Sequence, residues 1–148
     1  MEKTEFWNRV AFCNFLQSFA GEHARERPSA QQWDDVRSHR ALQSVLDCLQ
    51  PDRILVLGKK TWAYLPSSTD TLLRAPSPEP RLPIAEVFGQ AHKVDRTAFW
   101  YSFRPDGAAL AMPIVHPSSW GFAVADWQPT VERWMEFEQT SPTIEARS

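Results

Sequence analysis

The chain has 148 residues, of which 43% are hydrophobic and 23% are charged, and its formal net charge is −2. The length fits one domain with a single core, and the composition is ordinary for a soluble globular protein. The net charge excludes a uniformly basic nucleic-acid-binding chain, and no apolar run approaches the roughly 20 residues of a membrane span. We therefore expect one domain over residues 1–148, with frayed ends at 1–5 and 140–148 and no membrane association.

The first predicted element is a buried strand over Val10–Phe15 (VAFCNF), because this run is apolar and contains β-branched and aromatic residues. A polar loop follows. Ser29 is then a good N-cap for a helix that runs to about Leu49, and Pro28 and Pro51 bound this helix.

The second predicted strand is Arg53–Leu57 (RILVL), an almost continuous aliphatic run. Such a run is typical of a central parallel strand that is covered on both faces. Gly58 ends the strand, and Lys59–Leu65 is expected to form a short helix. The proline-rich stretch Pro66–Pro83 predicts an irregular excursion.

The last predicted elements are a hairpin and a helix. Thr97–Phe103 and Ala108–Val115 are apolar runs on either side of the turn sequence Arg-Pro-Asp-Gly, which predicts two antiparallel strands. Trp127 to about Gln139 is expected to be helical, with Asp126 as its cap.

The order of these elements predicts an α/β protein, a three-layer α/β/α sandwich with a mostly parallel central sheet. The carboxyl ends of such strands form the usual ligand edge. Each polar residue at this edge also has a purely structural interpretation, as a turn, cap or hydrogen-bonding residue. The residues expected there are Asn14, Gln17, Gly58, Lys59, His116, Ser118 and Ser119.

Several chemistries are not supported by the sequence. There is no GxSxG motif for a serine nucleophile and no Walker A or GxGxxG motif for a nucleotide. The four histidines have no metal-ligand spacing, so we expect neither a metal site nor a cofactor. Cys13 and Cys48 lie within apolar patterns without CxxC spacing, which predicts buried, reduced thiols. Because MEKTEFWNRV does not form a signal peptide, we expect a cytoplasmic protein.

Four successive features together resemble a known family: VAFCN, a helix, PDRILVLGKKTW and PIVHPSS. Over residues 6 to 122 their order and spacing resemble the later part of the uracil-DNA glycosylase superfamily. In that family one strand delivers an Asn that reads uracil, and the last strand carries a His-Pro-Ser loop that enters the minor groove of DNA. The resemblance implies a uracil-DNA glycosylase-like fold and a DNA-repair hydrolase that flips a base and breaks its N-glycosidic bond.

The resemblance also implies roles for individual residues. Asn14 would read the base and His116 would stabilise the oxyanion that develops on it, which makes these two the catalytic candidates. Trp120 would be the wedge that fills the vacated base stack. The other expected nucleobase- or DNA-binding residues are Gln17, Gly58, Lys59, Ser118, which would hold a phosphate, and Ser119.

One family feature has no counterpart in this sequence. The family's first motif, Gly-Gln-Asp-Pro-Tyr or Gly-Glu-Ala-Pro-Gly, positions the attacking water, and the few residues before Val10 leave no room for it. We therefore do not expect efficient excision. Two hypotheses follow, a glycosylase and a non-catalytic member of the fold that binds a nucleobase, nucleic acid or protein. An exposed sheet edge would also favour a homo-oligomer.

Overall fold

A computed structural model of the chain describes residues 5, 8–18, 20–23, 26–66, 81–89, 97–104 and 107–138. Regular structure begins with two helices, α2 (Ala30–Trp33) and α3 (Val36–Leu49), followed by strand β1 (Arg53–Leu57) and helix α4 (Lys59–Tyr64). Strand β2 (Arg81–Pro83) and helix α5 (Ile84–Val87) come next. The hairpin β3 (Thr97–Arg104) and β4 (Gly107–Ile114) and helix α6 (Val124–Glu136) complete the described elements.

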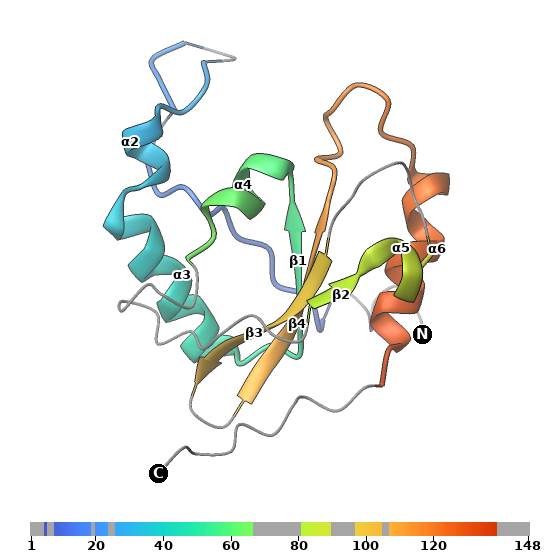
Figure 1. Cartoon of the computed structure of the whole chain (residues 1–148). Helices are drawn as coiled ribbons and strands as arrows, with labels where there is room; N and C mark the ends of the chain where they lie inside the picture. Colours follow the sequence, from blue (N-terminus) through green and yellow to red (C-terminus); the bar gives the residue numbers. More distant parts are fainter. Residues whose placement is uncertain are drawn as a thin grey trace.

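The four strands form one mixed sheet in the order β1-β4-β3-β2 (Figure 1). β1 runs parallel to β4, with Arg53 opposite Leu110 and Leu57 opposite Ile114. The β3–β4 and β2–β3 pairs are antiparallel. The expected α/β class and the hairpin are therefore confirmed, but the prediction of a mostly parallel sheet is wrong. The hairpin is the reason, because a tight turn joins neighbouring strands only in antiparallel orientation.

β4, not β1, is the strand covered on both faces. Its side chains alternate between two cores: Leu110, Met112 and Ile114 lie on one face, and Ala109 and Ala111 on the other. In the described part of the chain β1 pairs only with β4, and Leu55 is 37% exposed. The aliphatic run 53–57 is thus an edge strand, and whether its open edge supports a homo-oligomer stays a prediction.

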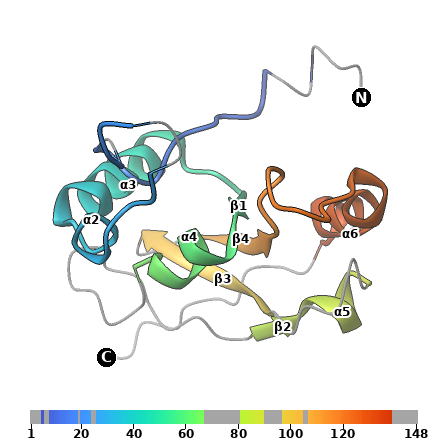
Figure 2. The same ribbon diagram turned by 90° about the horizontal axis from the view of Figure 1, so that it is seen from above.

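Helices lie on both faces of the sheet, as Figure 2 shows from above. On one face α5, the residue that follows it and α6 contribute to the core that contains Leu110 and its neighbours; the contributed residues are Ile84, Phe88, Trp127 and Trp134. On the other face Leu46 of α3 and Trp62 of α4 pack against the alanines of β4 and the aromatic residues of β3.

The helical region after Ser29 is divided in two. Ser29 caps α2 with a capping box, in which its hydroxyl accepts from Gln32 N–H while the Gln32 side chain accepts from Ser29 N–H. The expected cap is confirmed. Asp35 then caps a second helix by accepting from Arg37 N–H at 2.9 Å. Because this cap competes with continuation of α2, the prediction of one unbroken helix to Leu49 was wrong.

The segment Val10–Phe15 is not a strand, contrary to the sequence prediction. It has no regular structure, and its apolar side chains are largely uncovered, with Phe12 77% exposed. Strand propensity is realised only when a neighbouring strand supplies hydrogen bonds and a face supplies burial. Cys13 and Cys48 are exposed as well, so the prediction of buried thiols is also wrong.

Two further segments differ from the predictions. α6 begins at Val124, so Asp126 lies in its first turn and does not cap it. The stretch Pro66–Pro83 is not wholly irregular, because Arg81–Pro83 forms β2; residues 67–80 lie outside the described residues. Among the helices that the structure describes, none is long and apolar enough to cross a membrane.

Candidate functional site

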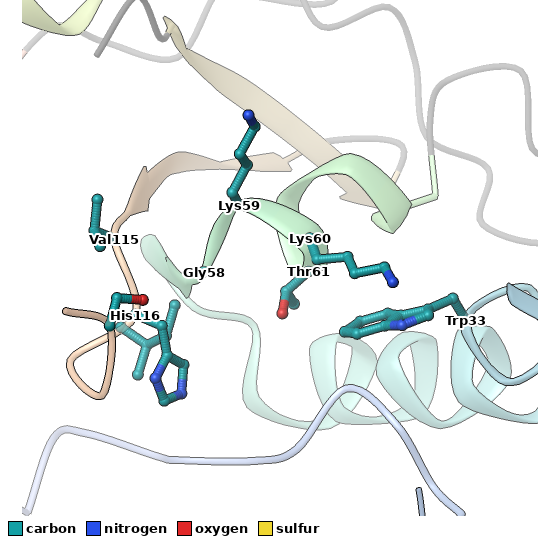
Figure 3. Close-up of a pocket in the computed structure, with 9 residues that line it drawn as sticks. Trp33, Gly58, Lys59, Lys60, Thr61, Val115 and His116 are labelled. Atoms are coloured by element: carbon teal, nitrogen blue, oxygen red, sulfur yellow. The ribbon is translucent and has the colours of Figure 1, made fainter. Parts of the chain in front are cut away.

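A pocket of about 470 Å³ opens at the carboxyl ends of the two parallel strands β1 and β4 (Figure 3). Its volume lies in the range of small-molecule sites. The pocket joins three elements that are distant in sequence: α2, the β1–α4 junction, and the loop after β4. Its lining residues are Trp33, Leu57, Gly58, Lys59, Lys60, Thr61, Val115, His116 and Ser119.

Gly58 makes the sharp turn from β1 into α4. Its φ is +100°, a conformation that side-chain-bearing residues rarely adopt. Its N–H donates to Ile114 O at 2.9 Å, and its carbonyl accepts from Trp62 N–H at 3.1 Å. The backbone is therefore held on both sides, and the first turn of α4 presents Lys59, Lys60 and Thr61 beside the end of β4.

His116 is held in one orientation by the loop that follows it. Its ring Nδ1 lies 3.1 Å from Ser118 N and 2.7 Å from Ser118 Oγ. A backbone N–H can only donate, so Nδ1 accepts and, in the neutral ring, the proton lies on Nε2. A further bond from Ser119 N–H to His116 O, 2.8 Å long, tightens the turn. The loop thus offers a pre-oriented Nε2–H donor at the pocket.

Trp33 forms the opposite wall of the pocket and is 8% exposed. Its ring lies 6.2 Å from Phe15 and 5.4 Å from Tyr64, both in stacked geometry, and Lys60 Nζ lies 5.7 Å from its centroid. Because Phe15, Tyr64 and Lys60 already contact this ring, Trp33 forms a rigid wall of the pocket and is not free to stack on a ligand. Figure 3 shows Trp33 and His116 on opposite sides, with Thr61 between them.

The structure brings four of the expected site residues to this pocket: Gly58, Lys59, His116 and Ser119. Ser118 does not line the pocket, but its N–H and hydroxyl contact His116 Nδ1 and orient the ring. Trp120 also lies outside the lining, and its side chain is fully exposed at 102%.

Asn14 and Gln17 are not among the lining residues of the pocket. Asn14 is exposed, and its carbonyl accepts from the Gln17 side chain at 2.8 Å. Gln17 N–H donates to Ser38 Oγ at 3.2 Å. Phe15, the residue after Asn14, stacks on Trp33. The segment is thus tied to α2 through Phe15 and to α3 through Gln17.

Sequence reasoning missed Trp33, Lys60 and Thr61. Lys60 and Thr61 had a usable signal, because they follow a strand-ending glycine and the first turn of such a helix borders the ligand edge. Trp33 had no comparable signal. Its position in an apolar helical stripe predicts a core residue, and only the tertiary structure places α2 at the pocket.

The charge of the pocket comes from Lys59 and Lys60, and among the described lining residues there is no carboxylate. Outside the pocket, hydrogen bonding from the Arg37 guanidinium and backbone lowers the pKa of the Asp35 carboxyl that caps α3. The described residues contain no group of three or more His, Cys, Asp or Glu that could hold a metal ion. The chemistry available at the pocket is therefore hydrogen-bond donation and attraction of negative charge.

Comparison with known proteins adds no family to this description. No protein-family model matches the chain, and no curated protein or solved structure matches it either. The resemblance to uracil-DNA glycosylases therefore rests on the sequence motifs.

Proposed function

We propose that this protein binds a nucleobase presented by single-stranded or locally opened DNA, in the manner of a uracil-DNA glycosylase-like protein. The observation that carries the proposal is the fixed Nε2–H donor of His116 at a pocket of about 470 Å³. A base carbonyl would accept from this donor. Leu57 and Val115 would contact the apolar surface of the ring, and the Trp33 edge would limit its size.

The surroundings of the pocket support a polyanionic ligand. Lys59 is exposed and, in Figure 3, points away from the other labelled side chains, so it is free to meet a phosphate outside the pocket. Trp120 stands fully exposed four residues beyond His116. If a nucleotide leaves a base stack to enter the pocket, a large apolar side chain on the same loop can fill the space that it vacates.

We propose binding of the nucleobase without catalysis, and hydrolysis of its N-glycosidic bond is the alternative. The described lining residues carry no carboxylate to orient a water molecule, whereas the donor that would polarise a base carbonyl is in place. Asn14 would contribute to base reading from the neighbouring segment, which Phe15 holds against Trp33.

The test is a titration of labelled single-stranded oligonucleotides that differ only in one central base, deoxyuridine, thymidine or deoxycytidine. We expect the wild-type chain to prefer deoxyuridine and His116→Ala to weaken that complex about 3- to 10-fold, the effect of one neutral hydrogen bond. His23→Ala is the matched control, because His23 is exposed and lies outside the pocket lining. Binding should also weaken steeply with salt.

Two results would change this conclusion. Equal affinity for the three bases, together with no effect of His116→Ala, would refute nucleobase binding. Alkali-sensitive strand breaks at deoxyuridine that appear with the wild-type chain and disappear with His116→Ala would establish the glycosylase alternative.

A further inference from the structure

Thr61 is a polar side chain in the lining of the pocket. It is the third residue of α4 and is half-buried. In Figure 3 its hydroxyl oxygen points into the space between His116 and Trp33. A Cβ on Gly58 would lie 3.8 Å from both Thr61 Oγ1 and His116 Cδ2, so the two side chains border the same space, which the glycine leaves open.

The hydroxyl of Thr61 is available to a ligand. A threonine in a helix often donates to the carbonyl one turn earlier, and Ser44 does so to Arg40 O at 3.0 Å. Thr130 of α6 donates instead to a carbonyl of another segment, Gly89 O, at 3.0 Å. Within the described part of the chain, Thr61 makes no side-chain hydrogen bond. It can therefore both donate and accept when a ligand arrives.

Thr61 also supplies a hydrogen-bond acceptor, in contrast to most other polar groups of the pocket. Lys59, Lys60, the Trp33 indole and the Nε2–H of His116 can only donate. Because His116 Nδ1 already accepts from Ser118 N–H, the hydroxyls of Thr61 and Ser119 are the only unoccupied side-chain acceptors among the described lining residues. Ser119 is exposed on the loop, whereas Thr61 is half-buried on a helix. A fixed and partly desolvated acceptor discriminates more strongly between ligands than an exposed one. Thr61 is therefore a better candidate than Ser119 for the residue that determines ligand specificity.

We propose that Thr61 determines specificity by accepting a hydrogen bond from a ring N–H of the ligand. The site then selects heterocycles that carry a lactam group, with its carbonyl on His116 and its N–H on Thr61. This inference rests on the proposed function and adds to it a chemical class of ligand. In a base already attached to deoxyribose, uracil offers this N–H only at N3, and methylation of N3 removes it.

The test combines variants of Thr61 with methylation of the ligand. Oligonucleotides containing deoxyuridine or N3-methyldeoxyuridine are titrated with the wild-type chain, Thr61→Val, Thr61→Ser and Ser119→Ala. We expect Thr61→Val to weaken deoxyuridine binding about 3- to 10-fold and to leave the affinity for the N3-methylated oligonucleotide unchanged. Thr61→Ser, which keeps the hydroxyl, should retain the preference for deoxyuridine, as should Ser119→Ala.

The outcomes separate this inference from the proposed function. Equal affinity for deoxyuridine, thymidine and deoxycytidine, together with no effect of His116→Ala, refutes both. A wild-type chain that binds the deoxyuridine and N3-methyldeoxyuridine oligonucleotides equally refutes the role of Thr61 alone. A wild-type chain that prefers deoxyuridine, with Thr61→Val unchanged or equally weakened for both oligonucleotides, refutes the role of Thr61 alone. So does a methylation effect that disappears in Asn14→Ala but persists in Thr61→Val. Thr61→Ala replaces the valine variant if the latter does not fold, as judged by its circular dichroism.

Discussion

Replacement of Gly58 by alanine tests the backbone that builds the pocket. The added Cβ would meet His116 Cβ at 3.5 Å and Thr61 Oγ1 at 3.8 Å, which is ordinary van der Waals contact. The penalty therefore comes from the backbone and not from a clash. With φ at +100° and ψ at 139°, Gly58 occupies a region that alanine reaches only with strain.

The strain cannot relax cheaply, because both backbone polar groups of Gly58 are hydrogen-bonded, to Ile114 and to Trp62. Rotation to a negative φ would break at least one of these bonds. We therefore expect Gly58→Ala to lower the free energy of unfolding by about 1–3 kcal/mol. Urea unfolding monitored by tryptophan fluorescence measures this change as a lower midpoint at constant slope.

Gly121→Ala is the control. Gly121 also has a positive φ, of +81°, but an added Cβ there meets nothing within 4 Å. The residue lies on an exposed loop and makes no backbone hydrogen bond in the part of the chain that the structure describes. Its backbone can therefore relax, and the loss should be smaller than at Gly58. A Gly58→Ala variant within about 0.5 kcal/mol of the wild type would refute the argument that backbone strain is locked in there.

Three other tests concern the core, a helix contact and the pH dependence. Trp134→Ala should cost about 3–5 kcal/mol of unfolding free energy because Trp134 is 2% exposed, whereas Trp120→Ala should change it by less than about 0.5 kcal/mol; equal losses in urea unfolding would contradict the burial of α6. Arg53→Met should cost about 1–3 kcal/mol, because the Arg53 guanidinium donates to two carbonyls at the C-terminal end of α6, and thermal melts that show no loss would rule out this contact. Hydrogen bonding from Arg37 lowers the pKa of the Asp35 carboxyl in the folded chain, so its stabilisation is complete above the unfolded pKa and is lost as the pH falls through the lower, folded value. Asp35→Asn keeps a capping side chain and should flatten this acid-side decrease of the melting temperature, and an unchanged profile would contradict the assignment.

The sequence was sufficient to predict a structural element wherever the interactions that form it are between residues close in the chain. Ser29 and Gln32 are three residues apart, and their reciprocal hydrogen bonds fix the start of α2 without help from the rest of the chain. Arg104 and Gly107 are likewise three residues apart, and they pair where β3 meets β4. The same holds for the strand–glycine–helix sequence around Gly58, whose conformation is a property of that residue.

The candidate site was predictable in part for the same reason. His116 and Ser118 are two residues apart, so the loop after β4 could be identified as chemically unusual from its sequence. Gly58 and Lys59 follow a recognisable strand and were expected at the same edge. Trp33 and Thr61 were not expected at this edge, because their place in the pocket lining depends on how α2 and α4 pack around the ends of β1 and β4.

Tertiary structure decided the features that depend on which segments become neighbours. The apolar composition of 53–57 fixes a strand but not its place, and pairing on one side only makes β1 an edge. The same composition at 10–15 gives no strand, because among the described residues no partner pairs with it, and Phe12 and Cys13 stay exposed. The physical reason is common to both: backbone hydrogen bonds between strands and burial against a helix are contacts between distant residues, and local composition does not encode them.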